Sequence, residues 1–208
     1  MQTKHREKSV WSFVIVAALA LLAGAIAAGV VLATQNVPES SASSADKHQG
    51  VVFIRGSSNA GPGAQAAVQA ISSGVPGLYS LTEGDVNSLL RTYWKPAAGD
   101  SAPLVRLTET PNLRIDVQGN VYLALRLSIP MISADTVFLY QARGHMAPGG
   151  FRADMGWIGQ CPVPLLNNLV IGMVRSGFEN GPEGANLKSI EGRISFSVDG
   201  GMLFVKVK

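Results

Sequence analysis

The chain has 208 residues, of which 47% are hydrophobic and only 15% are charged, so it has room for one folded domain with appendages. The first 33 residues hold three of its 17 basic residues and one of its 14 acidic residues. The remainder therefore has 14 basic against 13 acidic residues, a net charge of +1 without a Lys/Arg run, which argues against a nucleic-acid-binding surface.

An uncharged stretch from Val10 to Ala33 predicts a transmembrane anchor. At about 1.5 Å per residue it would span roughly 36 Å, enough to cross a hydrocarbon core of about 30 Å. The basic flank at residues 1–9 predicts a cytoplasmic N-terminus and an extracytoplasmic or periplasmic remainder. A signal peptide cleaved after Val31-Leu32-Ala33 is the alternative, but the apolar run is longer than a signal peptide usually has.

A stripe of small residues, Ala20, Gly24 and Ala28, lies along one side of this anchor. Such a stripe allows two membrane helices to approach closely, so it is a candidate homodimer contact. Alanine-rich spans also contain such stripes by chance, and both interpretations stay open.

Residues 34–77 are rich in Gly, Ser and Ala and predict a tether. Within it we expect a short apolar strand at Val51–Ile54 and a weak helix at Ala64–Ile71. Gly56 and Gly61 have the spacing of a phosphate-binding loop, but the Lys-Ser/Thr pair of such a loop is missing. A linker is therefore the preferred interpretation.

The folded domain is expected over residues 78–208, and an amphipathic helix opens it. Its apolar face has helical spacing and comprises Val86, Leu89, Leu90, Tyr93 and Trp94. Thr82 and Asp85 predict a capping box at its start, and Pro96 ends it. Asn87 lies on the flank of the apolar face, where we expect it to bond the backbone of a neighbouring strand.

Alternating apolar residues then predict antiparallel strands. Strands are expected at Leu104–Thr108, Thr136–Ala142 and Phe151–Met155. Between the first two, a hairpin with a three-residue loop is preferred because its register keeps one face apolar. That register pairs Val117 with Val121, Ile115 with Leu123 and Leu113 with Leu125.

The C-terminal part predicts a second amphipathic helix at Pro164–Phe178, a loop at Gly181–Gly184 and a closing hairpin. The helix stripe comprises Leu165, Leu166, Leu169, Val170, Met173 and Val174. A two-residue turn at Gly200-Gly201 pairs Val198 with Leu203, Phe196 with Val205 and Ile194 with Val207. The expected fold class is α+β, a curved antiparallel meander packed with two amphipathic helices behind one transmembrane helix.

The chain carries no strong catalytic signature. His145 and Cys161 could form a thiolate pair, but a structural thiol is far more common, and a single cysteine excludes an internal disulfide. Three aspartates in strand-rich sequence are expected to face solvent or cap turns: Asp116, Asp135 and Asp154. The part after the anchor has only His48 and His145 as histidines, too few to suggest a metal site. We expect no enzyme, no metal and no cofactor.

Three segments together resemble a known family. They are LTEGDVNSLL with Leu81, Thr82 and Asn87, LRIDVQGNVYLALRLSIP, and GFRADMGWIGQCPVPLLNNLV with Ile158, Gly159, Pro162 and Pro164. The pattern resembles the bacterial YpmS-like and LmeA-like proteins of the TULIP lipid-binding superfamily over about Leu78–Val174. Gly84 and Val86 depart from the family's helix start. The resemblance implies a tether to the bacterial cytoplasmic membrane, a bent sheet around a long helix, an apolar groove for acyl chains and no catalytic residues.

The expected function is that of a membrane-anchored, extracytoplasmic, non-enzymatic domain that binds lipid acyl chains in an apolar groove. The groove candidates are Leu89, Leu90, Tyr93, Trp94, Leu123, Leu125, Leu127, Trp157, Leu166, Leu169, Val170 and Met173. A dry core uses the same residue types, so composition does not separate the two. The alternative is a structural or protein-partner-binding envelope domain without a ligand.

Overall fold

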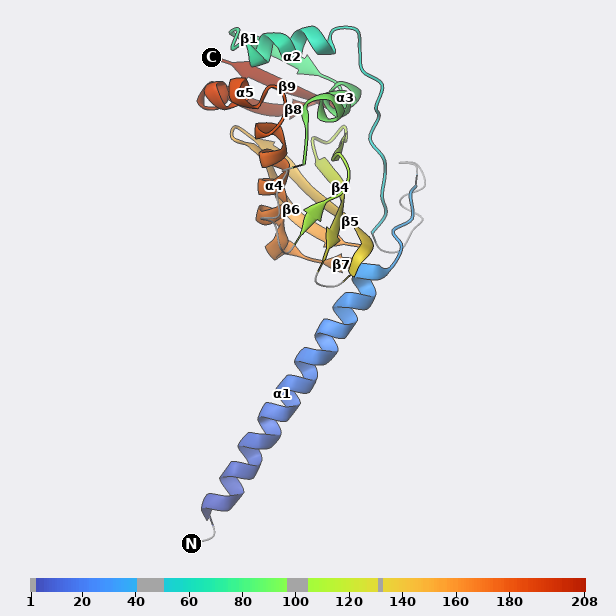
Figure 1. The fold of residues 1–208 in the computed structure, drawn as a ribbon, viewed down its shortest axis with the longest axis vertical. Helices are drawn as coiled ribbons and strands as arrows, with labels where there is room; N and C mark the ends of the chain where they lie inside the picture. The colour runs from blue at the N-terminus through green and yellow to red at the C-terminus, as the bar shows by residue number, and fades with distance from the viewer. Residues whose placement is uncertain (1–2, 41–50, 97–104, 131–132) are drawn as a thin grey trace.

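A computed structural model describes residues 3–40, 51–96, 105–130 and 133–208 of the chain. Strands and helices both contribute to the folded domain, and all pairs between its named strands are antiparallel. The α+β class predicted from the sequence is confirmed. The N-terminal helix stands clear of this domain along most of its length (Figure 1).

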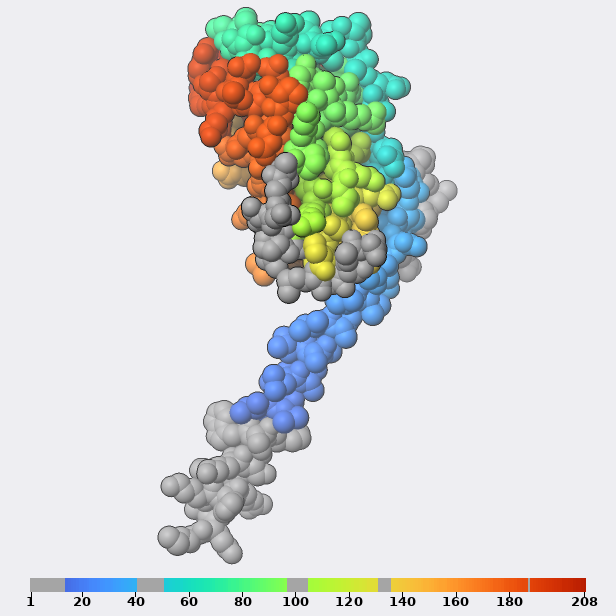
Figure 2. All heavy atoms as spheres, in the orientation of Figure 1, coloured from blue at the N-terminus to red at the C-terminus, as the bar shows by residue number. Residues whose placement is uncertain are grey.

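Helix α1 (Thr3–Thr34) contains the predicted apolar stretch. Its segment Val14–Thr34 has a mean hydropathy of 2.7, and none of its most apolar window is buried against the protein. By length and composition it could cross a membrane, and a signal sequence has the same properties. In the space-filling view the helix projects alone from one end of the domain (Figure 2).

The larger sheet has six strands in the order β2-β4-β5-β6-β7, and β3 also pairs with β4. Its strands are β2 (Arg106–Leu107), β3 (Asn112–Ile115), β4 (Val121–Ile129), β5 (Ser133–Ala147), β6 (Gly150–Ile158) and β7 (Cys161–Pro162). Strands β5 and β6 are longer than predicted, because pairing continues to a two-residue loop between Ala147 and Gly150.

A separate three-stranded sheet has the order β1-β9-β8, with β1 (Gly77–Leu81), β8 (Ile194–Asp199) and β9 (Met202–Val207). It lies at the end of the domain far from α1 (Figure 1). The described strands therefore form two sheets, where the sequence predicted one meander. Strand β1 was not predicted, because its partner is the distant C-terminal strand and its apolar residues Leu78, Tyr79 and Leu81 do not alternate along the chain.

The two predicted hairpin registers had different outcomes. The closing hairpin is confirmed, with Val198 opposite Leu203 and Ile194 opposite Val207. The register of the first hairpin is wrong by two residues, since Ile115 pairs with Val121. The carboxylate of Asp116 accepts the backbone N–H groups of Gln118 and Asn120 at 2.9 Å and so stabilises a longer loop. A shift of two residues keeps the side chains of the strands on their predicted faces. The predicted pair of Val117 with Val121 is wrong, because Val117 lies in the turn and is 82% exposed.

The domain helices are α2 (Ala64–Ser72), α3 (Glu83–Tyr93), α4 (Asn167–Glu179) and α5 (Gly184–Ile190). Helices α2 and α3 confirm the two helices predicted before the strands. A 3-10 helix, η2 (Pro164–Leu166), precedes α4, and another, η3 (Glu191–Arg193), follows α5. The sequence did not predict α5, which begins at the last residue of the expected loop.

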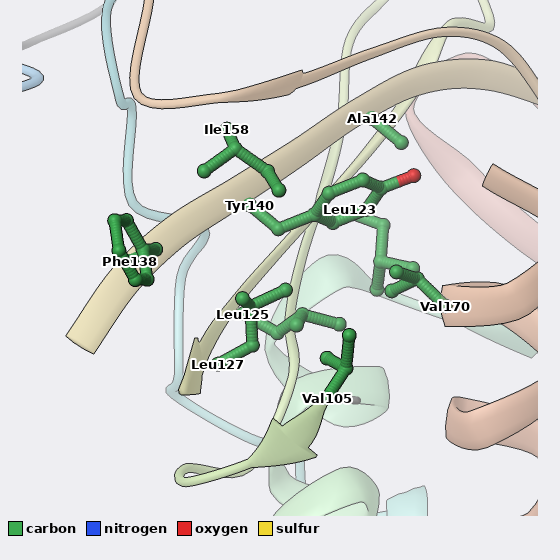
Figure 3. Packing of buried hydrophobic residues seen from close by; sticks show 9 residues of the cluster. All are labelled: Val105, Leu123, Leu125, Leu127, Phe138, Tyr140, Ala142, Ile158 and Val170. Carbon is green, nitrogen blue, oxygen red and sulfur yellow. The ribbon is translucent and has the colours of Figure 1, made fainter. Parts of the chain in front are cut away.

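The described apolar residues form two core clusters. The larger cluster joins the six-stranded sheet to α4, and Figure 3 shows Tyr140 and Val170 within it. The smaller cluster joins the three-stranded sheet to α2, α3 and the end of α5, with Leu81 and Ile190 among its members. The core is thus divided between the region next to α1 and the region farthest from it.

Candidate functional site

The first turn of α3 is the most densely hydrogen-bonded place in the described part of the domain. The Thr82 hydroxyl accepts the backbone N–H of Asp85 at 3.2 Å, and the Asp85 carboxylate accepts the N–H of Thr82 at 2.8 Å. This is the capping box that the sequence predicted, with both of its hydrogen bonds present.

Asn87 is 1% exposed and bonds the backbone of two other segments. Its amide nitrogen donates to the carbonyls of Ser57 and Leu113 at 2.6 and 2.7 Å, and its oxygen accepts the N–H of Leu113 at 2.7 Å. The predicted bond to a neighbouring strand is confirmed, since Leu113 belongs to β3. All three of these hydrogen bonds hold other segments of the chain, which gives Asn87 a structural role, and the residue also borders the hollow beside α3 that is described below.

The glycine-rich segment at residues 56–61 runs over this helix start. The backbone N–H of Gly61 donates to the Asp85 carboxylate at 2.5 Å, and that of Ser57 donates to the Glu83 carboxylate. A phosphate-binding loop needs such N–H groups free to bind an anion. Because protein carboxylates occupy them, the geometry agrees with the linker interpretation.

These hydrogen bonds also determine the ionisation of Asp85. Burial alone would raise the pKa of Asp85, but hydrogen bonds from the Thr82 hydroxyl, the Thr82 N–H and the Gly61 N–H together lower it below its usual value. The carboxylate is charged at neutral pH and is held by donors on both sides. Its charge stabilises the fold and is not available as a general acid.

The twelve groove candidates do not converge on one cavity. Six of them are buried, each at 5% exposure or less: Leu90, Trp94, Leu123, Leu125, Leu127 and Val170. Five are half-buried: Leu89, Tyr93, Trp157, Leu166 and Met173. Leu89 packs in the smaller cluster, whereas Leu123, Leu125, Leu127 and Val170 belong to the larger one.

The arrangement of β6 separates Trp157 from the candidates on α4. The neighbouring Gly156 faces α4, because a Cβ there would lie 1.9 Å from the side-chain oxygen of Asn167. Side chains alternate along a strand, so Trp157 lies on the other face of the sheet. Trp94, by contrast, contacts α4, since its indole N–H donates to the Val174 carbonyl at 2.9 Å.

The predicted apolar stripe of the second helix is wrong at two positions. Leu165 is 94% exposed and Leu169 is 46% exposed, whereas Val170 is buried. Pro164–Leu166 forms a 3-10 turn with about three residues per turn, so Leu165 leaves the face that an α-helix from Pro164 would give it. Leu169, which lies in α4 itself, is exposed on the same outer side.

A hollow of about 450 Å³ lies beside the C-terminal half of α3. Its wall includes the side chains of Arg55, Arg91 and Glu109 together with Trp94 and Pro111. It is open to solvent on one side and mainly polar, which differs from the apolar groove that the family resemblance implies. Arg55 is already engaged by Glu39, whose carboxylate it contacts at 2.9 Å.

The residues considered for catalysis lie apart. Cys161 pairs with Ile158, and Ile158 pairs with Tyr140, which is five residues from His145 along β5. At about 3.3 Å per residue this separates His145 and Cys161 by roughly 16 Å along the strands. His145 instead contacts Asp154 at 3.3 Å on the exposed surface.

Little else in the described residues suggests a reactive centre. Asp116 caps its own turn, and although burial opposes this, bonds from Asn120 and Gln118 lower its pKa. No group of three or more His, Cys, Asp or Glu residues that could hold a metal is found among the residues the structure describes. Asp135 has no described side chain and His48 lies outside the described residues.

The end of α1 contacts the domain at the turn between β6 and β7. The backbone N–H of Gln160 donates to the Leu32 carbonyl at 2.9 Å, and Ala33 packs against the larger core cluster. Next to this contact, the Gln160 side chain bonds both backbone groups of Val51, at 2.7 and 2.8 Å. The sequence did not predict these contacts, because they join segments that lie far apart along the chain.

No protein-family model, no curated protein and no solved structure matches this chain. The resemblance to TULIP proteins therefore stays a hypothesis.

Proposed function

We propose that the chain is a single-pass protein of the bacterial cytoplasmic membrane, with its N-terminus inside and a non-enzymatic domain on the extracytoplasmic side. The domain acts through its outer surface, as a structural or partner-binding unit held next to the membrane. The observation that carries the proposal is the packing of the end of α1 into the folded domain.

This packing supports an anchor that is not cleaved. Leu32 and Ala33, which belong to the alternative cleavage site, contact the β6–β7 turn. A Cβ at Gly159 would lie only 2.4 Å from the Ala33 carbonyl oxygen, so the two backbones are in close contact. Cleavage after Ala33 would remove the Leu32–Gln160 hydrogen bond and part of the packing around the larger cluster.

Action through the outer surface is supported by the state of the core. Four of the six buried groove candidates belong to the larger packed cluster, and protein interiors of this kind have few voids larger than a water molecule. An acyl chain in the larger cluster would have to displace side chains such as Leu127, which is fully buried. A partner that binds to the outer surface would displace no core side chain.

The anchor and its orientation can be tested together on the full-length chain with a C-terminal tag, expressed in a bacterium. We expect it to stay in the membrane fraction after alkaline carbonate extraction and to have an intact mass that includes residues 1–33. Protease added to spheroplasts should digest the domain. A soluble product that starts at Thr34 would contradict the proposal, and so would a domain that is protected from the protease.

A matched control for orientation is provided by the basic flank. Replacement of Lys4, Arg6 and Lys8 by Glu removes the excess positive charge that keeps the N-terminus inside. We expect a smaller fraction of this variant to be digested in spheroplasts. Equal digestion of both proteins would show that the flank does not set the orientation.

Binding of acyl chains is a second candidate, favoured by one feature of α4. Leu166 and Met173 lie half-buried between α4 and the large sheet, and the exposed Leu169 borders them. Native mass spectrometry of the full chain, released from the membrane in mild detergent, tests this candidate. A mass increment equal to one lipid that survives dilution supports it, whereas a homogeneous mass of the chain alone contradicts it.

A further inference from the structure

A run of 20 residues without charge, from Met155 to Val174, separates Asp154 from Arg175. In the structure it forms the end of β6, strand β7, the 3-10 helix η2 and the first two turns of α4. We define this as the uncharged segment. It lies at the end of the domain where α1 is attached, and α4 runs from there away from α1 (Figure 1).

The outer side of the uncharged segment is apolar. Leu165 is 94% exposed, the largest value among the exposed large hydrophobic residues of the described chain, and Leu169 follows one turn later at 46%. Pro162 and Pro164 are also exposed. Single exposed leucines are common on protein surfaces, but a nearly full exposure within an uncharged stretch suggests an apolar partner.

The position of α1 indicates what this partner is. The Cys161 sulfur lies 3.9 Å from where a Cβ on Gly29 would be, so the β6–β7 turn reaches down to Gly29. Gly29 precedes the end of α1 at Thr34 by five residues, or about 7.5 Å along the helix axis. If Val14–Thr34 crosses the hydrocarbon core, the turn lies at the depth where interfacial helices insert, about 5–10 Å.

The hydrogen bonds of the uncharged segment suit an environment with little water. The backbone N–H of Gln160 donates to Leu32, that of Val163 to Gly156 at 2.8 Å, and that of Leu166 to Val163 at 3.0 Å. Pro162 and Pro164 have no N–H to satisfy. Unpaired backbone groups are costly in hydrocarbon, and this turn avoids that cost at several positions.

The polar side chains of the segment that point inward are satisfied as well. Gln160 bonds the backbone of Val51, and the buried Asn167 accepts the hydroxyl of Tyr140 at 2.8 Å. Trp157 lies half-buried at the same end of the domain. Tryptophan is enriched where membrane proteins meet the membrane–water interface. The exposed asparagine of the segment, Asn168, lies beside Leu169 on the outer side of α4.

We propose that the uncharged segment inserts Leu165, and with it the start of α4, into the outer interface of the same bilayer that α1 enters. This inference rests on the proposed anchor and adds a second, shallow contact with lipid. It fixes the orientation of the domain on the membrane and leaves the three-stranded sheet facing away. The recognised chemistry is the apolar region just below the lipid headgroups.

The experiment uses the full chain in vesicles of phosphatidylcholine and phosphatidylglycerol. Cys161 is replaced by Ser, and a single cysteine is introduced as Leu165→Cys for an environment-sensitive NBD label. Leu78→Cys in the same background is the matched control, because Leu78 is a leucine 66% exposed on β1, at the far end of the domain. Leu169→Cys gives an intermediate position, one helical turn above Leu165.

We expect the label at position 165 to emit at shorter wavelength than the label at 78. Lipids with a nitroxide near the top of the acyl chain should quench the label at position 165 several-fold more strongly than the label at position 78. Quenching of a label at position 169 should lie between the two. Flotation of the same vesicles is measured in parallel. If the chain floats but positions 165 and 78 are equally unquenched, the insertion is overturned and the anchor stands. If the chain does not float, both proposals are overturned.

Discussion

Two helix starts of this domain are built in opposite ways. At the start of α3, Thr82 and Asp85 cap the helix reciprocally, and Asn87 holds two other segments. At the start of α4, no side chain caps the helix, and a 3-10 turn presents Leu165 to the outside. The first start satisfies its hydrogen bonds within the protein, whereas the second leaves apolar surface without a partner from the described protein.

The difference shows how a feature that stabilises the fold can be told apart from one that acts outside it. A buried network with complete hydrogen bonding explains its own presence, because each group stabilises the fold. An exposed leucine contributes little to the stability of the folded chain, so a role for it is sought in contacts outside the domain. Substitutions at the two helix starts should therefore differ in their effect on the free energy of unfolding, and the following predictions test this.

The largest effect is expected for Asn87→Asp. The carboxylate has the same size, but it cannot donate to the carbonyls of Ser57 and Leu113 as the amide does. We expect the free energy of unfolding to fall by about 3 kcal/mol, as measured by urea denaturation of the full chain in micelles with tryptophan fluorescence. The exposed Asn168→Asp at the start of α4 is the control, with a change within about 0.5 kcal/mol. Equal losses in the free energy of unfolding for Asn87→Asp and Asn168→Asp would show that Asn87 supports the fold no more than an exposed asparagine does.

Two helical glycines give the next contrast. A Cβ at Gly84 in α3 would lie 1.9 Å from the carbonyl oxygen of Asn59, so the segment crossing the helix would have to move. We expect Gly84→Ala to destabilise by about 2 kcal/mol. Gly172 in α4 has no neighbour within 4 Å of such a Cβ, so Gly172→Ala should stabilise by about 0.5–1 kcal/mol through helix propensity. The same denaturation experiment measures both, and a stabilising Gly84→Ala would show that Asn59 does not lie against α3.

A smaller effect, dependent on pH, is expected for Asp85→Asn. The native state lowers the pKa of Asp85, so the charged form contributes stability above the ordinary Asp value of about 3.9, and this contribution is lost as the pH falls through the lower native value. At pH 7 the variant should be less stable by about 1.5 kcal/mol, and the gap should narrow below about pH 4. The exposed Asp199→Asn is the control. If the difference in stability between Asp85→Asn and the unchanged chain grew as the pH falls, the lowered pKa of Asp85 would be contradicted.

The smallest effect is expected at the start of α4. Leu165→Ser removes a side chain that is 94% exposed, so unfolding in micelles should change by less than about 0.5 kcal/mol. Val170→Ala, five residues later, removes methyl groups from the larger core and should cost about 2 kcal/mol. A large loss for Leu165→Ser would show that this leucine supports the fold and would weaken the case for a lipid contact.

Much of the local structure could be predicted from the sequence. The apolar helix, the capping box of Thr82 and Asp85, the bond from Asn87 to a strand and the pairing around Gly200-Gly201 all appear in the structure. Gly84 is unfavourable inside a helix, but the backbone of Asn59 packs so closely against it that a larger residue would not fit. A contact of that kind has no pattern in a single sequence.

The candidate surface was less predictable than the fold. The α-helical period placed Leu165 on the buried face, whereas the 3-10 turn at Pro164–Leu166 turned it outward. The two periods differ by only about 0.6 residue per turn, and Pro at the first position suits either helix. Which of the two forms depends on how the preceding turn packs between β6 and the end of α1.

By itself, the sequence determined the features that depend on neighbours within a few residues: an apolar helix, the capping box at the start of α3 and a tight hairpin. Only the tertiary structure decided that β1 pairs with the C-terminal strand, that Gln160 holds Val51 across 109 residues, and that the end of α1 packs on the β6–β7 turn. Local preferences follow from backbone sterics and short-range hydrogen bonds. Contacts between distant segments form only when burial of apolar surface outweighs the loss of chain entropy, which no local pattern encodes.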